Sequence, residues 1–208
     1  SQALICRALR EAFPGDPVIG EEDAALLRVL AQQDMLQQVV GQVEKLRPGA
    51  TGEQVCEWID LGNAKDYSPR FWTLDPIDGT KGFVRQYPFF STQIALMHRG
   101  EIIVGVSSGT MMDELAWAEK DKGAWLNGVQ LSVSDISDPD RAAVSTGNLK
   151  SLAATDGWID LGRIVERADR IRGYGDFYHY HLLAAGKIDA VIDPAETRRW
   201  ILSATSGR

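Results

Sequence analysis

The sequence predicts an α+β fold in which helices come first, a mostly antiparallel sheet follows, and helices then alternate with strands. Three observations carry this prediction. The apolar residues repeat with a helical period up to about residue 62 and with a strand period after residue 70. Two tight turns, at Arg99-Gly100 and Asn127-Gly128, join consecutive strands, as in antiparallel hairpins. Beyond residue 140, helical stretches alternate with short apolar strands.

The first third of the chain reads as helices around one short strand. Helical periods cover about residues 1–13 and, in one or two pieces, residues 23–46, and Thr51 to Gln54 form a capping box that opens a third helix. Between the first two helices, residues 18–19 make a very short strand that leads into Glu21-Glu22. We expect residues 23–62 to form a helical insertion.

The rest of the chain reads mainly as strands. The expected strands cover residues 71–74, 91–97, 102–107, 115–118, 129–133, 142–145 and 190–192. The expected helices begin near residue 79 and cover residues 159–170 and 178–185, with Gly186 ending the last one.

Composition places the chain among globular proteins and excludes some partners. With 208 residues, 44% of them apolar and 25% charged, it is long enough for one sizeable domain or two small ones. The formal net charge of -7 argues against a nucleic acid polymer held on a basic surface, although a metal can still recruit a small anion. No apolar run approaches the roughly 20 residues of a membrane helix, and no signal peptide is visible. We therefore expect a cytoplasmic protein without a membrane partner.

The two cysteines, Cys6 and Cys56, fall in helical patterns, with neither a CxxC spacing nor a nearby histidine cluster. This is typical of reduced thiols in the core of a cytoplasmic protein. The first of these helical patterns begins at the first residue, so we also expect that an upstream segment is absent.

The stretch WTLDPIDGTKGF, residues 72–83, places two carboxylates where a strand is expected to end. Asp75 points out of the sheet edge, and Pro76 prevents further strand pairing through its nitrogen and turns Asp78 back toward Asp75. Two carboxylates and the exposed carbonyl of Ile77 are hard oxygen ligands, which suit Mg²⁺ or Mn²⁺. The spacing therefore predicts a divalent-metal site.

A phosphate site is expected beside it. Gly79 and Thr80 come at a helix start, where free N–H groups and the helix dipole favour an anion. The alternative is that the two aspartates are only turn and cap residues, since DP and DG are common in loops. A second acidic pair, Glu21-Glu22, also follows a short apolar strand. Two such strand ends favour a metal and phosphate loop over residues 75–83.

Four stretches resemble one known family. They are GEE at 20–22, DPIDGT at 75–80, GAWLNG at 123–128 with the following VS at 133–134, and GYGDFYHYHLLAAGKIDAVID at 173–193. Together they resemble the inositol monophosphatase superfamily, a group of Mg²⁺-dependent, lithium-inhibited phosphomonoesterases. The resemblance covers about residues 1–200. It implies a layered α/β sandwich of the inositol monophosphatase (sugar phosphatase) type that is incomplete at both termini. It also implies a single domain over residues 1–208, in which the half that faces the substrate begins near residue 140.

The resemblance implies a role for each residue of the metal site. Glu21 would bind the first metal and, together with Thr80, polarise the attacking water. Asp75 would bridge two metals. The carbonyl of Ile77 would complete the first site, and Asp78 would bind the second metal. Two or three Mg²⁺ ions are expected on this basis, or fewer if a ligand is missing.

The resemblance also implies a substrate site. Main-chain N–H groups of Gly79 and Thr80 would bind the phosphate. Asp193 falls at the position of an acid that binds a substrate hydroxyl, and Gly175 and Asp176 fall near the organic half of the substrate. The implied partner is a small phosphorylated molecule, and a homodimer stays open.

Three departures from the family pattern bear on activity. The family has an acidic motif ending in Ala-Asp upstream of Glu21, and that region is missing. It has an aspartate that binds the second metal directly after the tryptophan matching Trp200, where this chain has Ile201. It also continues for some tens of residues. The chain is then a fragment, a divergent member with fewer metals, or an inactive relative.

Two parts of the chain favour different substrates. The insertion, its WIDLGN at 58–63, and FWTLDPIDGTKGF resemble the 3'(2'),5'-bisphosphate nucleotidase branch, which we predict. GDFYHYHLLAAG at 175–186 resembles the branches that hydrolyse inositol 1-phosphate and histidinol phosphate, which are the alternative. A catalytically impaired relative that binds a ligand or pairs subunits, and a structural domain with acidic caps, are the alternatives outside enzymology.

His179 and His181 lie two residues apart in the last expected helix. This spacing puts them on different faces, which disfavours a shared metal. We expect surface histidines, or histidines that support a neighbouring site residue.

Overall fold

The computed structural model describes residues 1–29, 32–65 and 68–193, which divide into two compact units. Unit 1 holds residues 1–76 and 94–101, and unit 2 holds residues 77–93 and those from 102 onward. The boundary between Pro76 and Ile77 falls inside the acidic stretch. The prediction of a single domain over residues 1–208 stays a prediction. Within the described residues, no helix is long and apolar enough to cross a membrane.

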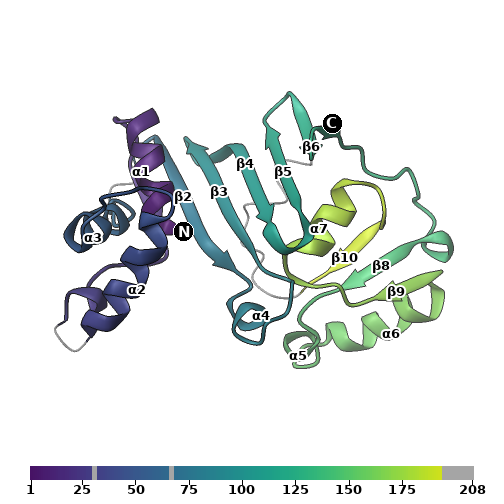
Figure 1. Ribbon diagram of the computed structural model, residues 1–208. Coiled ribbons are helices and arrows are strands. Elements are labelled where there is room, and N and C mark those ends of the chain that lie inside the picture. Colours follow the sequence, from purple (N-terminus) through teal and green to yellow (C-terminus); the bar gives the residue numbers. More distant parts are fainter. Residues whose placement is uncertain (30–31, 66–67, 194–208) are drawn as a thin grey trace. The chain divides into compact units, whose positions relative to one another are not determined.

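The described elements form two sheets with helices around them (Figure 1). Seven strands form the first sheet in the order β1 to β7, and three strands form the second in the order β10-β8-β9. The pairings of β4 with β5, β5 with β6 and β6 with β7 are antiparallel. This confirms the predicted α+β fold with a mostly antiparallel sheet.

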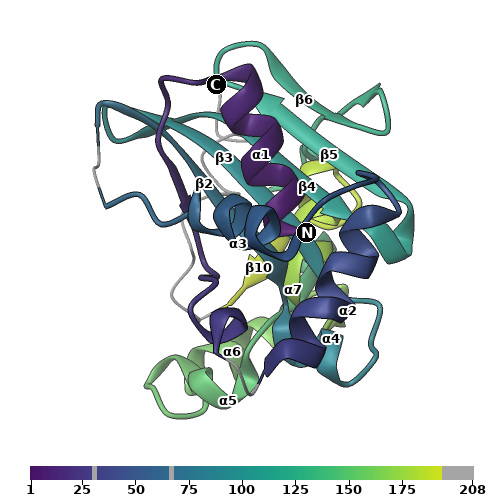
Figure 2. The ribbon, with the colours of Figure 1, turned by 60° about the vertical axis from the view of Figure 1, so that its left-hand side comes forward.

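The described residues in the helical part of unit 1 include three α-helices, a short 3₁₀ helix and a short strand. Their bounds are α1 (Gln2–Ala12), β1 (Val18–Gly20), η1 (Leu26–Arg28), α2 (Gln33–Glu44) and α3 (Gly52–Asp60). Figure 2 shows α1 and α3, which pack against each other. Cys6 and Cys56 are buried and free, which confirms their predicted place in the core. Apolar side chains of this core are Ala3, Leu27, Val43, Val55 and Ile59.

Two local signals in unit 1 are confirmed. The Thr51 side chain accepts a hydrogen bond from the Gln54 amide, and the Gln54 side chain accepts one from the Thr51 amide, so the capping box opens α3 as predicted. The helical pattern predicted over residues 23–46, in one or two pieces, forms η1 and α2 as separate pieces among the described residues.

Strand β2 (Arg70–Asp78) carries the acidic stretch and runs parallel to β1. The register pairs Val18 with Trp72 and Gly20 with Leu74. The predicted end of this strand near residue 75 is therefore wrong, because the strand continues through Pro76 to Asp78.

The position of Pro76 explains this continuation. The amide of Trp72 donates to the Pro17 carbonyl on the β1 side, at 2.9 Å. Amide direction alternates along a strand, so the nitrogen of Pro76 faces the same side as that of Trp72. On that side β1 has already ended at Gly20, opposite Leu74. The missing N–H of proline thus faces an unpaired edge, where proline is tolerated.

The other strands and helices continue the first sheet and build the second. Their bounds are α4 (Thr80–Val84), β3 (Ser91–His98), β4 (Glu101–Gly109), η3 (Thr110–Met112), β5 (Glu114–Glu119), β6 (Gly123–Leu126), β7 (Val129–Gln130), η4 (Pro139–Arg141), β8 (Ala143–Thr146), α5 (Leu149–Leu152), α6 (Gly157–Arg167), β9 (Arg170–Arg172), α7 (Asp176–Ala184) and β10 (Ala190–Ile192). Both predicted tight turns are confirmed, since Arg99, Gly100, Asn127 and Gly128 all have positive φ.

The three-stranded sheet is parallel throughout, and one of its strands was not expected. The helix predicted over residues 159–170 stops at Arg167, and β9 begins at Arg170. The strand has the sequence Arg-Ile-Arg. Its single apolar residue, Ile171, is too little to show the alternation of apolar and polar residues by which a strand is predicted. The strand predicted over residues 129–133 is also shorter: β7 covers residues 129–130, and the Leu131 amide still donates to the Ala124 carbonyl at 2.8 Å.

Candidate functional site

In unit 1, Glu21 directly follows β1, and Asp75 lies inside the neighbouring strand β2. The parallel register pairs Gly20 with Leu74, so Glu21 and Asp75 come next on adjacent strands at the same edge. Neighbouring strands lie roughly 4.8 Å apart. Asp75 is buried, whereas Glu21 is exposed. The register thus sets the backbones of Glu21 and Asp75, the two residues expected to share a cation, on adjacent strands.

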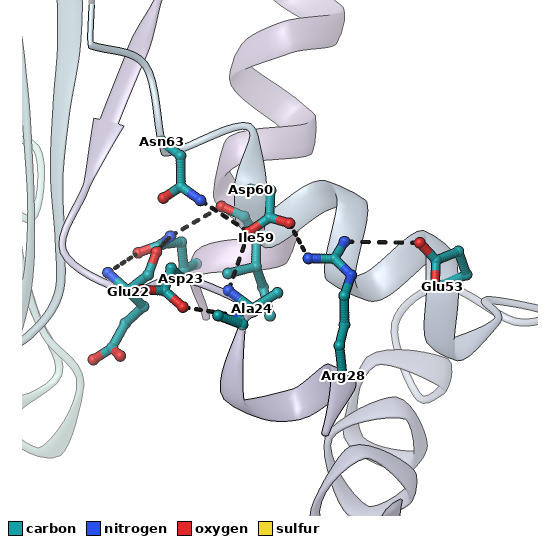
Figure 3. A network of polar contacts seen from close by, with 10 residues as sticks. Glu22, Asp23, Ala24, Arg28, Glu53, Ile59, Asp60 and Asn63 are labelled. Atoms are coloured by element: carbon teal, nitrogen blue, oxygen red, sulfur yellow. Dashed lines mark hydrogen bonds and ion pairs between the residues drawn. The ribbon is translucent and has the colours of Figure 1, made fainter. Parts of the chain in front are cut away.

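The chain that follows Glu21 is held through its backbone (Figure 3). The amide of Glu22 donates to the side chain of Gln2, that of Ala24 to Asp60, and that of Ala25 to Asp23, at 2.8–3.0 Å. The Glu22 side chain stays exposed, as that of Glu21 does.

Asp60 is the centre of this polar network (Figure 3). One of its oxygens accepts from the Ala24 amide and from Asn63, and the other accepts from Arg28. Burial alone would raise the pKa of Asp60, but the hydrogen bonds from Arg28 and Ala24 more than offset it and hold the pKa below its ordinary value. The loop is therefore tied to α3 through a carboxylate that stays ionised.

In unit 2, the end of β2 turns into α4 through a glycine. Gly79 has φ 85°, and a Cβ at this position would lie 2.7 Å from the carbonyl oxygen of Phe89. Only glycine suits both conditions. The Thr80 hydroxyl donates to the Ile77 carbonyl at 3.1 Å. The first amides of a helix have no acceptor inside it, which leaves them able to bind an anion.

Three carboxylates of unit 2 converge near this turn. The carboxyl carbon of Asp176 lies 3.6 Å from the point that a Cβ on Gly79 would occupy. Burial, and then the negative charges of Asp78 and Asp193, raise the pKa of Asp176. Gly175 and Asp176 both have positive φ, at 70° and 47°. This left-handed backbone places Asp176 at the start of α7.

Asp193 follows β10 and is fitted into the turn after β8. Its Oδ1 accepts from the Asn148 amide at 3.3 Å. A Cβ on Gly147 would lie 2.2 Å from its Oδ2, so a larger residue there would displace the carboxylate. His179 Nε2 lies 3.9 Å from the same Oδ2.

Both histidines of α7 are buried, so the expectation of surface histidines is wrong. The helix touches β10, and it lies so close to β4 that a Cβ on Gly109 would be 2.3 Å from the Phe177 ring. A helix that is packed on two opposite faces can bury both of two residues that are two positions apart. The sequence signal for this is that His179 and His181 lie within a stretch of apolar and aromatic residues, 177–185.

His181 is the centre of a complete polar network. Its Nδ1 lies 2.7 Å from Glu114 Oε2, and its Nε2 lies 2.8 Å from Ser107 Oγ. Gln93 Nε2 donates to the hydroxyl groups of Ser107 and Ser91. A carboxylate only accepts, so Nδ1 carries the hydrogen, and Ser107 donates to Nε2. Burial lowers the pKa of His181, although Glu114 opposes it, so the ring is neutral at pH 7.

This arrangement has the roles of a serine–histidine–acid triad, but the Ser107 oxygen is buried and already accepts from Gln93. The hydroxyl is therefore closed to a substrate. We interpret the network as support for α7.

His179 has fewer partners. Its Nδ1 is 3.4 Å from Ser145 Oγ, and its buried Nε2 has no hydrogen-bond partner. Burial lowers the pKa of His179, and Asp193 opposes this. The ring thus presents an unsatisfied nitrogen toward the carboxylate expected to bind substrate.

Three aromatic rings of unit 2 lie close together. Tyr178, two residues after Asp176 in the sequence, lies 5.9 Å from Phe89 and 5.8 Å from Tyr174, measured between ring centres.

The carboxylates of Glu21, Asp75 and Asp78 and the Ile77 carbonyl are each, in chemistry, a hard oxygen donor of the kind that suits a divalent cation. The first two belong to unit 1 and the last two to unit 2. Over residues 1–29, 32–65 and 68–193, no group of three or more His, Cys, Asp or Glu side chains is placed to hold a metal. The substitution at Ile201 lies outside the described residues.

Comparisons with known proteins identify the family of the chain. The model of the inositol monophosphatase family matches residues 1–201. A histidinol-phosphatase of Mycobacterium tuberculosis is 35% identical over 156 residues, covering 70% of this chain and 57% of the relative. A 3'(2'),5'-bisphosphate nucleotidase of Candida albicans is 32% identical over 146 residues, covering 65% and 40%. The chain thus spans about half the length of these relatives.

Solved structures support the fold. An inositol monophosphatase from Thermotoga maritima has a TM-score of 0.68 at 23% identity, covering 98% of this chain and 63% of that one. One from Anabaena has a TM-score of 0.67 at 22% identity, covering 98% and 67%. The resemblance expected from four short stretches is confirmed over nearly the whole chain.

Proposed function

The chain belongs to the inositol monophosphatase family, and from that premise we propose that it is a Mg²⁺-dependent phosphomonoester hydrolase. The observation that carries the proposal is the register of β1 and β2, which sets Glu21 beside Asp75 at one edge. Acids at paired positions repel unless a cation or a proton lies between them. An exposed acid just after β1, next to a buried acid inside β2, is suited to hold a metal.

We assign the metal ligands as the family pattern implies. Glu21 and Asp75 would bind the first ion with the Ile77 carbonyl, and Asp78 would bind a second. Bound Mg²⁺ supplies charge neutralisation of the phosphate and a lower pKa for its water. Glu21 and the Thr80 hydroxyl would orient that water toward phosphorus.

We assign the substrate contacts to unit 2. The amides of Gly79 and Thr80, at the start of α4, would donate to phosphate oxygens. Asp193 would accept a hydrogen bond from a substrate hydroxyl. Gly175 and Asp176 would contact the organic half. Cytoplasmic location, lithium sensitivity and a homodimer remain predictions from the sequence.

The charge of unit 2 bears on the choice of substrate. Burial, and then the negative charges of Asp78 and Asp193, raise the pKa of Asp176, and Tyr174 and Tyr178 flank this residue in the sequence. This favours an organic half that is cationic or planar, such as the amino and imidazole groups of histidinol phosphate. We therefore put histidinol phosphate first.

A 3'(2'),5'-bisphosphate nucleotide is the second candidate. It is favoured by the residues around the acidic stretch and by the 32% identity to a bisphosphate nucleotidase. Its second phosphate would have to avoid the carboxylates of unit 2 or be neutralised by metal.

The test is phosphate release from histidinol phosphate, adenosine 3',5'-bisphosphate and inositol 1-phosphate with Mg²⁺, with and without Li⁺. We expect release from one of the first two, and its loss in Asp75→Asn. Ligand binding without turnover at any Mg²⁺ concentration would indicate a binding module instead. The absence of any Mg²⁺-dependent thermal shift would indicate a structural domain.

A further inference from the structure

Gln2 is a buried polar residue in the first turn of α1, with 4% of its surface exposed. Its Oε1 accepts from the Glu22 amide at 3.0 Å. Its Nε2 donates to the carbonyl of Glu22 and, at 3.1 Å, to that of Ile59. One side chain therefore binds both backbone groups of the residue that follows Glu21, as a paired strand would.

Glutamine is specifically suited to this place. A backbone N–H only donates, so the oxygen of the amide must face Glu22 N, and the nitrogen must face the two carbonyl groups. Its one acceptor and two donors are all used. A carboxylate at position 2 would instead place an oxygen against the carbonyl oxygens of Glu22 and Ile59.

Two glycines make room for the amide. A Cβ on Gly20 would lie 2.7 Å from the Gln2 side chain, and a Cβ on Gly62 would lie 2.8 Å from its Nε2. The two glycines are joined by a hydrogen bond of 2.7 Å from Gly20 N to Gly62 O. The end of β1 and the end of α3 are thus shaped around Gln2.

We propose that Gln2 is a positioning residue for Glu21. Gln2 binds both the N–H and the C=O of Glu22. These two contacts fix the backbone next to Glu21, and this orients the Glu21 carboxylate toward the edge where Asp75 lies. Asp60 and Asp23 bind later amides, those of Ala24 and Ala25, and leave Glu22 to Gln2. The proposal rests on the proposed function, because it assumes that Glu21 binds metal.

The test compares Gln2→Glu with Val55→Ala, a control in the same core that leaves the amide contacts intact. Metal binding is measured directly, with Mn²⁺ by electron paramagnetic resonance, and activity is measured against Mg²⁺ concentration. We expect both variants to melt at a lower temperature. Only Gln2→Glu should bind Mn²⁺ and Mg²⁺ about tenfold more weakly, with a smaller change in kcat at saturating metal.

Gly62→Ala provides an independent test. The added methyl group would push the Gln2 amide from Glu22 without changing residue 2, so it should weaken metal binding as Gln2→Glu does. Metal binding within twofold of wild type in both variants would overturn the assignment and leave the proposed function intact. A wild-type chain that binds no Mn²⁺ and shows no Mg²⁺-dependent activity would overturn the proposed function and the assignment with it.

Discussion

The two histidines of α7 lie two residues apart and meet opposite surroundings. His181 has both ring nitrogens in short contacts, with Glu114 and Ser107. His179 has one contact of 3.4 Å and one buried nitrogen without a partner. Both rings are buried to almost the same extent. The difference is therefore in hydrogen bonding, and it separates a histidine that holds the fold from one placed beside a candidate site residue.

The comparison follows from the cost of burying polar atoms. A satisfied network in a low-dielectric interior stabilises, whereas an unsatisfied nitrogen costs about 1–3 kcal/mol. A stable fold tolerates such a cost where the residue also serves the functional site. The unsatisfied nitrogen of His179 lies 3.9 Å from Asp193, the residue expected to bind a substrate hydroxyl.

The largest expected effect is that of His181→Leu. The substitution leaves Glu114 and Ser107 without their central partner, so the free energy of unfolding should fall by about 2–4 kcal/mol. Urea denaturation measures this. A loss below about 1 kcal/mol would show that the network contributes little and would remove the contrast between the two rings.

Lowering the pH should give the next largest effect. Both folded-state pKa values are lowered, chiefly by burial, so the unfolded chain binds more protons as pH falls through about 6.5. Stability should be fully present above this range and decrease below it, by at most about 1.4 kcal/mol per pH unit for each ring. Urea denaturation between pH 7.5 and 5.5 measures the slope. If His181→Leu leaves the slope unchanged, that ring does not contribute to it.

The smallest effect on stability is expected for His179→Leu. Removing an unsatisfied nitrogen offsets the lost contact with Ser145, so the free energy of unfolding should change by less than about 1 kcal/mol. Asp193 loses its neighbour, so kcat/KM should fall about tenfold, equal to about 1.4 kcal/mol. Urea denaturation and steady-state kinetics measure the two quantities. Unchanged kinetics would assign His179 to packing alone.

Features that depend on a few adjacent residues could be predicted from the sequence. The capping box at Thr51, the turn at Asn127-Gly128 and the helix start after Gly79 all depend on local backbone chemistry. Asp78, Asp176 and Asp193 were named from the family pattern, and their role in binding stays a prediction.

Features that depend on distant partners could not be predicted. The continuation of β2 through Pro76 depends on where β1 ends, and β9 depends on pairing with β8 rather than on its own Arg-Ile-Arg sequence. The burial of His179 and His181 depends on elements packed on opposite faces of α7. The role proposed for Gln2 depends on two glycines, eighteen and sixty residues away in the sequence.

Both cysteines of the chain, Cys6 and Cys56, lie in unit 1. Burial raises the pKa of both thiols, that of Cys6 to about 11, so neither is reactive at neutral pH while its helix stays packed. Alkylation of the native chain can proceed only through opening of unit 1. The rate of thiol labelling therefore reports on the helices around Gln2, without any signal from the parallel sheet that carries Asp193.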